Sequence, residues 1–300
     1  MALSICNTVT DPSGRELLER GVAAFPFACY RDTLGAEMVP WHWHAEWEAI
    51  RIIEGAAVLA VGREKYTLCA GEGAFINAGV LHAMWSADGA DCRFHSLVFH
   101  PRLVGGGIDS VFDQAYVRPL TEDPAAASVR LEPSEPRQQD ALAAIETAWE
   151  NGVQEPPGYE FRVRAALSKL VFAVWEQSRG TARKPGAKAL RDAERIKTML
   201  RFVHDHYAEE LNTKQIAASA IVSESECLRC FRGTIGTTPI QYVKQYRIQQ
   251  AAYLLTATQD KVADIAARCG FQDLSYFTKS FREQKGCTPT EYRKREQGLP

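Results

Sequence analysis

Three histidines and one glutamate in the first third of the chain have types and spacings suited to metal chemistry. His42, His44 and Glu48 follow one another at even intervals, so their side chains would share one face of a β-strand. His82 lies in a second segment, Gly71–His82, that is also rich in glycine. Imidazole nitrogens and carboxylate oxygens are ligands for Zn, Ni, Fe or Mn.

The two segments resemble the paired motifs of the cupin barrel, HxHx3Ex6G and Gx5PxGx2H. In this sequence they run from His42 to Gly55 and from Gly71 to His82. Asn77 stands where the family usually has proline, and Ser86 where it usually has asparagine. The resemblance implies that the three histidines and the glutamate converge inside a β-barrel, where they can hold a divalent metal ion.

A pocket without metal is the alternative interpretation. In that case His42, His44, Glu48 and His82 only line a cavity for a small-molecule effector. We assign Phe75 to the same effector pocket, with ordinary core packing as its alternative. The ligand set alone also permits a metal-dependent cupin enzyme of the dioxygenase or isomerase class.

The elements around these residues are predicted from local patterns. Residues 25–100 alternate apolar and polar side chains between glycine-rich turns, which is typical of short strands in a sandwich or barrel. Residues 102–136 look irregular. Apolar stripes at helical spacing predict helices over about 137–151 and 159–178.

Four features recur in the last third of the chain at an offset of 49 or 50 residues, which predicts one structural unit present twice. The recurring pairs are Ile216-Ala217-Ala218 and Ile265-Ala266-Ala267, Phe231-Arg232 and Phe281-Arg282, Gly236-Thr237-Thr238-Pro239 and Gly286-Cys287-Thr288-Pro289, and Tyr242 and Tyr292.

Each unit has the pattern of a short helix, a tight turn and a second helix. In the first unit Ser223 is predicted to cap the second helix, with Glu226 completing a capping box. In the second unit Gly270 ends the first helix and Asp273 caps the next. A long helix over about 239–256 would join the two units.

These residues resemble the DNA-binding domain of the AraC-type transcription regulators over about 100 residues. The resemblance rests on Leu228-Arg229-Cys230-Phe231-Arg232, Cys269-Gly270-Phe271, Ser275-Tyr276-Phe277 and Phe281-Arg282, among other matches. It implies two helix-turn-helix units that read successive major-groove faces of double-stranded DNA.

By this analogy the first recognition helix reads bases with Ser225, Leu228 and Arg229, and the second with Leu274, Ser275 and Lys279. Arg229 and Lys279 would donate to guanine or to phosphate. Solvated surface charge is the alternative for both. Further phosphate candidates are Arg232, Arg247, Arg282 and Arg293.

Composition supports a globular regulator of two parts. The chain has 300 residues, of which 46% are hydrophobic and 24% charged, so wholesale disorder is excluded. Residues 190–300 carry 17 Lys and Arg against 13 Asp and Glu, whereas the remainder is acidic. The chain shows no signal peptide or membrane span, which predicts a cytoplasmic protein with free cysteines, and Cys227 and Cys230 are predicted to pack in the core.

We therefore expect a cupin-like sensor barrel over 1–136, two helices over 137–178 that pair two protomers, a linker over 179–189, and an all-α double helix-turn-helix domain over 190–297. The predicted function is a transcriptional regulator, not an enzyme, that binds an operator sequence under control of a small effector. A homodimer is expected, with RNA polymerase as a further partner. A scaffold that only dimerises would show no sequence-specific DNA binding.

Overall fold

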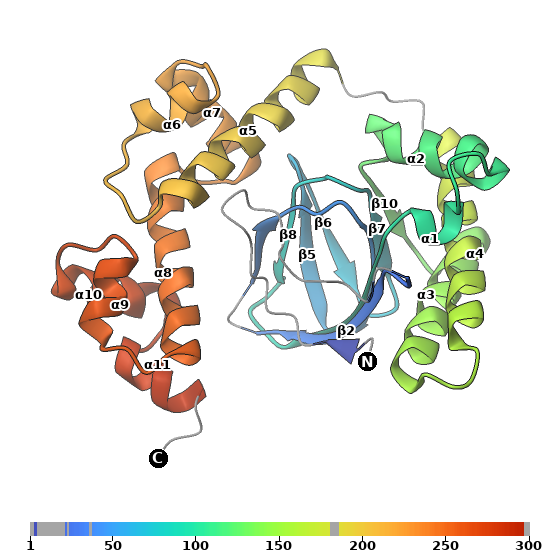
Figure 1. Cartoon of the computed structure of the whole chain (residues 1–300), viewed down its shortest axis with the longest axis horizontal. Helices are drawn as coiled ribbons and strands as arrows, with labels where there is room; N and C mark the ends of the chain where they lie inside the picture. The colour runs from blue at the N-terminus through green and yellow to red at the C-terminus, as the bar shows by residue number, and fades with distance from the viewer. Residues whose placement is uncertain (1–2, 5–21, 23, 36–37, 181–185, 297–300) are drawn as a thin grey trace. The chain divides into compact units, whose positions relative to one another are not determined.

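The computed structural model describes residues 3–4, 22, 24–35, 38–180 and 186–296, and these residues fall into two units (Figure 1). The first unit ends at Arg191 and the second begins at Asp192. Each unit is described by itself below. The predicted linker over 179–189 lies partly outside the described residues.

The first unit is built on two β-sheets that face each other. The larger sheet has the strand order β1-β2-β9-β4-β7-β10 and the smaller one the order β3-β8-β5-β6. The strands are β1 (Leu3–Ser4), β2 (Phe27–Leu34), β3 (Val39–His42), β4 (Trp47–Glu54), β5 (Ala56–Val61), β6 (Glu64–Cys69), β7 (Gly73–Ile76), β8 (His82–Ser86), β9 (Cys92–Phe99) and β10 (Ser128–Leu131).

Alternation along each strand places buried apolar clusters on both faces of the larger sheet. On β4, Ile50 and Ile52 point between the sheets and pack with side chains of the smaller sheet. Trp47 and Ala49 point to the outer face of the larger sheet, against helices. A two-residue turn that begins at Gly62, which has φ +55°, joins β5 to β6.

Residues 102–136 are more regular than predicted. They form α1 (Arg102–Gly105), the π-helical turn η1 (Asp113–Val117), α2 (Arg118–Glu122), the 3₁₀ turn η2 (Pro124–Ala126) and β10. Strand β10 pairs antiparallel with β7 and extends the larger sheet. Its pairing depends on a partner more than 50 residues away, which local sequence patterns do not reveal.

The outer face of the larger sheet is covered by α3 (Pro136–Gln154) and α4 (Tyr159–Gly180), which also pack on each other (Figure 1). Both helices were predicted, and each is slightly longer than its stripe of apolar residues. Glu155 ends α3 in a left-handed conformation, and the Pro156-Pro157-Gly158 segment separates the two helices.

The second unit is all-helical in its regular elements. Its helices are α5 (Ala187–His206, whose first residues precede the unit), α6 (Thr213–Ser219), α7 (Glu224–Thr234), α8 (Pro239–Ala257), α9 (Val262–Arg268), α10 (Leu274–Lys285) and α11 (Pro289–Glu296). The pairs α6–α7 and α9–α10 are the repeated helix-turn-helix units, and α8 joins them (Figure 1).

The two repeated turns reach the same conformation with different residues. Gly270 ends α9 with φ +81°, where glycine has no steric penalty. Ile221, at the equivalent place after α6, has φ +53°. A β-branched residue with this φ is an outlier, so the first turn is held in place by its surroundings.

Within the described part of the chain, every helix is too short or too polar to cross a membrane.

Candidate functional site

The structure brings the four predicted metal-ligating residues together inside the first unit. His42 ends β3 and pairs in register with His82, the first residue of β8. The ring centroids of His42 and His82 lie 4.1 Å apart. Glu48 enters from β4 in the facing sheet, and His44 from the segment between β3 and β4. All four side chains are buried.

Backbone carbonyl groups fix the orientation of each imidazole. Nδ1 of His42 lies 2.8 Å from the Pro40 carbonyl oxygen. Nδ1 of His44 lies 3.0 Å from the Glu46 carbonyl oxygen, and Nδ1 of His82 lies 2.8 Å from the Val80 carbonyl oxygen. A carbonyl only accepts, so Nδ1 carries the proton in each ring. In the neutral form, Nε2 then presents a lone pair.

The Glu48 carboxylate faces two of these rings. Its Oε2 lies 3.0 Å from Nε2 of His82 and 3.2 Å from Nε2 of His44. Its Oε1 accepts a hydrogen bond of 2.8 Å from the Ser96 hydroxyl. Burial raises the pKa of Glu48, but when the rings of His44 and His82 also carry a proton on Nε2, their hydrogen bonds and charge outweigh burial and hold this pKa well below the ordinary value.

This arrangement needs positive charge at its centre. In neutral rings, the Nε2 lone pairs of His44 and His82 would face the Glu48 carboxylate. Both sides of this contact are hydrogen-bond acceptors, so they would repel each other. Extra protons on the rings are one source of charge, but burial and the other two histidines lower the pKa of His42 well below its ordinary value. A metal ion is the other source, because it accepts lone pairs from all four groups.

The spacing of the candidate ligand atoms fits one ion. Ligand atoms from all four side chains lie within 4.8 Å of one another. Ligands bound at about 2.1 Å from an ion lie roughly 3.0–3.4 Å from their neighbours. The two contacts of Glu48 with His82 and His44 fall at this separation, so the donor set fits a divalent transition metal.

The cavity beside these residues is small, about 30 Å³. Its polar wall includes His42, Glu48, His82 and Ser96, and the rest is largely apolar. Phe75 does not line it, contrary to the prediction. Phe75 lies opposite Ala49 in the pairing of β4 with β7, so it points to the outer face, where its ring packs 5.5 Å from that of Trp47.

In the second unit, the predicted base-reading side chains of α10 lie together on its exposed side. Leu274, Ser275 and Lys279 are exposed, and Arg282 follows one turn later. With neighbouring side chains they line a shallow groove of about 770 Å³. Asp273 caps the helix as predicted, because its carboxylate accepts from the Tyr276 amide at 2.6 Å. The structure thus presents the N-terminal half of α10 to solvent.

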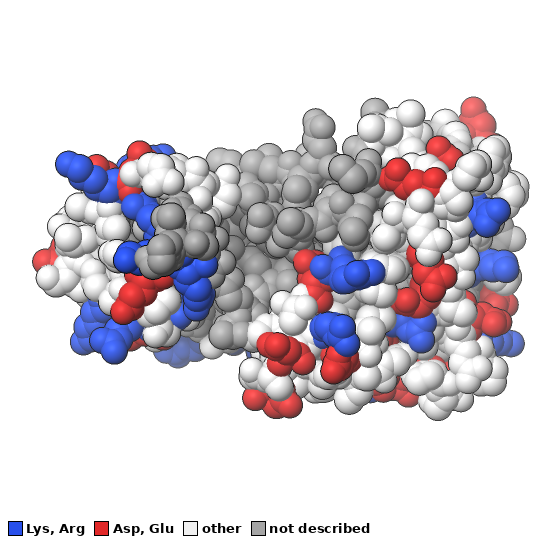
Figure 2. All heavy atoms as spheres, turned by 90° about the horizontal axis from the view of Figure 1, so that it is seen from below, with Lys and Arg blue, Asp and Glu red and all other residues white. Residues whose placement is uncertain are grey.

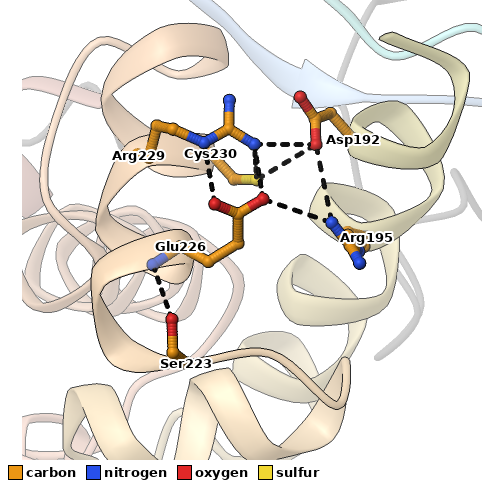
Figure 3. A network of polar contacts seen from close by, with 6 residues as sticks. All are labelled: Asp192, Arg195, Ser223, Glu226, Arg229 and Cys230. Carbon is orange, nitrogen blue, oxygen red and sulfur yellow. Dashed lines mark hydrogen bonds and ion pairs between the residues drawn. The ribbon is translucent and has the colours of Figure 1, made fainter. Parts of the chain in front are cut away.

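Helix α7 presents a different surface. Ser225 and Arg232 are exposed and Leu228 is half-buried, as a contact surface requires. Arg229, however, turns back toward α5 (Figure 3). Its guanidinium donates to Asp192 at 2.8 Å and to both oxygens of Glu226 at 2.6 and 2.9 Å.

Arg229 is thus part of an ion-pair network inside the second unit, and not the outward-facing base reader predicted from the sequence. The hydrogen bonds that the Arg229 guanidinium donates to the Glu226 and Asp192 carboxylates raise the pKa of Arg229. Arg195 joins the network through Glu226 at 3.2 Å. The predicted capping box is also incomplete: Ser223 accepts from the Glu226 amide, but the Glu226 side chain pairs with the two arginines instead (Figure 3).

Arg247 and Arg293, two of the predicted phosphate ligands, cap helix ends within the second unit. Arg247 donates to the carbonyl oxygens of Tyr207 and Glu209, both at 2.6 Å. Arg293 donates to those of Leu255 and Asp260 at 3.1 and 2.7 Å. Leu255 lies in the last turn of α8, and the other three carbonyls lie in the segments that follow α5 and α8, so the two arginines hold these segments in place.

Cys227 and Cys230 are buried core residues, as predicted. Burial raises the pKa of the Cys227 thiol to about 12, so this thiol stays protonated at neutral pH. Cys230 lies near the carboxylates of Asp192 and Glu226, but the Arg229 guanidinium neutralises this cluster. The cluster therefore lacks the character of a cation site.

Charge is distributed unevenly between the two units. Figure 2 shows Lys and Arg prominent on the visible face of the second unit, at the left of the view. On the visible face of the first unit, basic and acidic side chains are interspersed. A basic excess is the electrostatic signature of contact with phosphate groups.

Two family models match the chain at these sites. Residues 25–171 match the AraC-like ligand binding domain. Residues 216–295 match a helix-turn-helix domain model. The chain belongs to the AraC-type transcriptional regulators.

Relatives of known name agree with this assignment. The regulator is 29% identical over 293 residues to the uncharacterized HTH-type transcriptional regulator YdeC of Bacillus subtilis (strain 168), covering 96% of this chain and 98% of that one. It is 32% identical over 107 residues to the transcriptional activator RhaS of Escherichia coli O139:H28, covering 36% and 38% of the two chains. Among solved structures, ToxT from Vibrio cholerae O395 covers 91% of this chain and 99% of its own at 12% identity, with a TM-score of 0.48.

YdeC and RhaS are named as a transcriptional regulator and a transcriptional activator, and the predicted regulatory function is confirmed.

The structure adds two residues that sequence reasoning missed. Asn77 is buried and accepts from the Trp47 indole at 2.8 Å, while its amide donates to the Leu120 carbonyl at 2.8 Å. The sequence signal for this role was that Asn77 replaces the proline usual in the cupin motif. Asp192, the buried partner of Arg229, gave no signal beyond its position at the start of a helical stretch.

Proposed function

We propose that the regulator binds a specific sequence of double-stranded DNA through its two helix-turn-helix units, with α10 as the principal reading helix. The observation that carries this proposal is the exposed side of α10. Leu274 and Ser275 lie in its first turn, where a recognition helix meets base edges. Lys279 and Arg282 supply donors for bases or phosphate beside them.

Helix α7 takes a secondary part in this proposal. Ser225 and Leu228 would face the neighbouring groove, and Arg232 a phosphate group. Glu224 and Glu226 in its first turn repel phosphate, and Arg229 is held by acidic partners. The helix-turn-helix formed by α6 and α7 would therefore position the protein on DNA more than it selects bases.

Selection from a random-sequence duplex library tests the proposal. The purified full chain is incubated with the library, and the bound fraction is amplified and sequenced over several rounds. We expect one enriched motif with conserved positions grouped about one helical turn (roughly 10 base pairs) apart. Recovery of unenriched DNA through every round would reject sequence-specific binding.

We also propose that His42, His44, Glu48 and His82 hold one divalent ion of Zn, Ni, Fe or Mn. The support is the donor set itself: oriented Nε2 atoms and a carboxylate that needs a cation between them. Elemental analysis of the purified chain tests it. We expect close to one equivalent of one of these metals per chain, and much less in a Glu48→Gln variant.

We further propose a homodimer that forms through α4. Phe161 and Phe172 are 81% and 47% exposed, although both are large and apolar. They lie 11 residues apart, about three helical turns, with the exposed Ala165 on the same side. A second copy of this stripe would bury it symmetrically. Sedimentation should give a dimer for the wild type and a monomer for Phe161→Glu/Phe172→Glu.

We also propose that the regulator acts in the cytoplasm and that RNA polymerase is its further partner. A regulator bound at an operator changes transcription only by affecting polymerase at the adjacent promoter. Transcription in vitro from a template that carries the selected motif beside a promoter tests this step. We expect the transcript level to change on addition of the regulator, and to stay constant when the motif is scrambled.

A further inference from the structure

The space beside the candidate metal ligands is too small for an organic effector. A cavity must offer about 10–15 Å³ to hold one water, so the 30 Å³ here accommodate about two. Pockets for small organic ligands measure roughly 300–1,000 Å³. The apolar part of the wall includes Ile50, Leu59, Met84 and Phe94, which fill the remaining interior of the barrel.

Strand β9 connects this interior to helix α3. Ser96 points inward and donates to Glu48. Its neighbour His95 points outward, stacks on Trp149 of α3 at 3.6 Å with an interplanar angle of 3°, and lies 3.1 Å from a Glu146 carboxylate oxygen. Adjacent residues of one strand thus contact the candidate metal site on one face and α3 on the other.

Strand β4 makes a second connection. Glu48 points inward, and its neighbour Trp47 points outward and donates to Asn77. Asn77 in turn donates to the Leu120 carbonyl in α2. Leu120 packs in the same apolar core as α3 and α4. A shift of Glu48 would therefore reach the helices by two independent routes.

We propose that the effector of this regulator is the divalent metal ion itself, and that its binding is transmitted through β9 and β4 to helices α3 and α4. The inference rests on the proposed DNA-binding function and on the metal site proposed above. Binding draws Glu48 and the three histidines toward one centre. The strands that carry them adjust, and the helix pair that supports the proposed dimer changes its packing. Only a difference in metal affinity between the two arrangements can drive this change.

The test uses the full chain stripped of metal with a chelator and titrated separately, without oxygen, with Zn²⁺, Ni²⁺, Fe²⁺ and Mn²⁺. Calorimetry measures binding, and hydrogen exchange measures protection of Pro136–Gln154 and Tyr159–Gly180. Affinity for the selected DNA motif is measured with and without metal. We expect micromolar or tighter binding of one metal, altered protection of α3, and at least about a fivefold change in DNA affinity.

Three variants separate the steps. Glu48→Gln keeps the side-chain volume, and we expect it to weaken metal binding by about 100-fold or more. Glu54→Gln, on the exposed end of the same strand, weakens only a solvent-exposed ion pair with Arg93, and as the matched control it should behave as wild type. His95→Leu keeps an apolar contact with Trp149 but removes both the ring stacking and the Glu146 contact. We expect it to bind metal normally and to lose most of the change in α3 protection and DNA affinity.

The outcomes are distinguishable. Metal that binds without altering α3 protection or DNA affinity is structural only, and that result overturns the inference. So does a metal-free protein that responds to an organic compound in its DNA affinity, or a chain that binds none of the four ions. Failure to bind any DNA motif rejects the proposed function, and altered α3 protection would still support the transmission from metal to helix.

Discussion

The Arg229 guanidinium lies 2.8 Å from the Asp192 carboxylate and joins the first recognition helix, α7, to α5 (Figure 3). Asp192 is only 2% exposed, whereas Arg229 is about one-third exposed. Removing Arg229 would leave a buried carboxylate without its main cation. The pair therefore contributes to the position of α7 within the second unit.

We predict that Arg229→Ala lowers the free energy of unfolding by about 2 kcal/mol, because it leaves Asp192 buried and poorly compensated. Arg232→Ala, on the exposed side of the same helix, should change it by less than about 0.5 kcal/mol. Urea unfolding followed by circular dichroism measures both. If Arg229→Ala instead weakened DNA binding with full stability, Arg229 would be a DNA contact after all.

The difference between prediction and structure at Arg229 has a definite cause. Helical periodicity and the repeat correctly placed Arg229 on a recognition helix. Whether its guanidinium faces DNA or α5 depends on Asp192, which is 37 residues away in the sequence. A charge pair between helices depends on their packing, and periodicity within one helix does not encode packing.

The same limit explains the barrel. Even spacing predicted that His42, His44 and Glu48 share one face of a single strand. The structure instead brings them together from β3, from the segment after it and from β4 of the facing sheet, so their meeting depends on how the sheets pack. Phe75 belongs to another strand, and its face is set by the register that places it opposite Ala49. A shift of one residue in that register would have turned Phe75 inward. The repeat and Gly270 were predicted correctly because both are recognised from residue type and spacing alone.

Lys279 on α10 allows a direct test of DNA contact. We predict that Lys279→Ala weakens binding to the selected motif about fivefold and reduces the slope of log affinity against log salt by about 1, because one contact with DNA phosphate is lost. Lys197→Ala removes one positive charge that already pairs with Glu194 on α5, and serves as the control. Fluorescence anisotropy at several salt concentrations measures both. Equal effects of the two substitutions would indicate a general charge effect and not a contact of α10.

Ile221 and Gly270 occupy equivalent positions in the turns of the two helix-turn-helix units, and substitutions there should change stability in opposite directions. Ile221 has φ +53° and is 93% exposed, so its side chain gains little from burial while its backbone is strained. We predict that Ile221→Gly raises the unfolding free energy by about 0.5–1 kcal/mol. Gly270→Ala should lower it by about 2 kcal/mol or more, since the backbone is left-handed and the new Cβ would lie 2.8 Å from the Ala208 carbonyl oxygen. Thermal unfolding of the two variants measures these shifts, and a destabilised Ile221→Gly would contradict the assigned strain.

Alkaline pH should destabilise the second unit through the buried thiol of Cys227. Burial raises its pKa from 9.0 to about 12, so the unfolded thiol ionises at a lower pH than the folded one. The resulting stability is complete below pH 9.0 and is lost as the pH rises toward about 12, by up to about 1.4 kcal/mol per pH unit. We predict that Cys227→Ala reduces the slope of unfolding free energy against pH between about pH 9 and 10.5, and that Cys69→Ala, at an exposed site, leaves the slope unchanged. Urea unfolding at each pH measures the slopes. An unchanged slope for Cys227→Ala, or rapid alkylation of Cys227 in the folded protein at pH 8, would show that the thiol is accessible and not held protonated by burial.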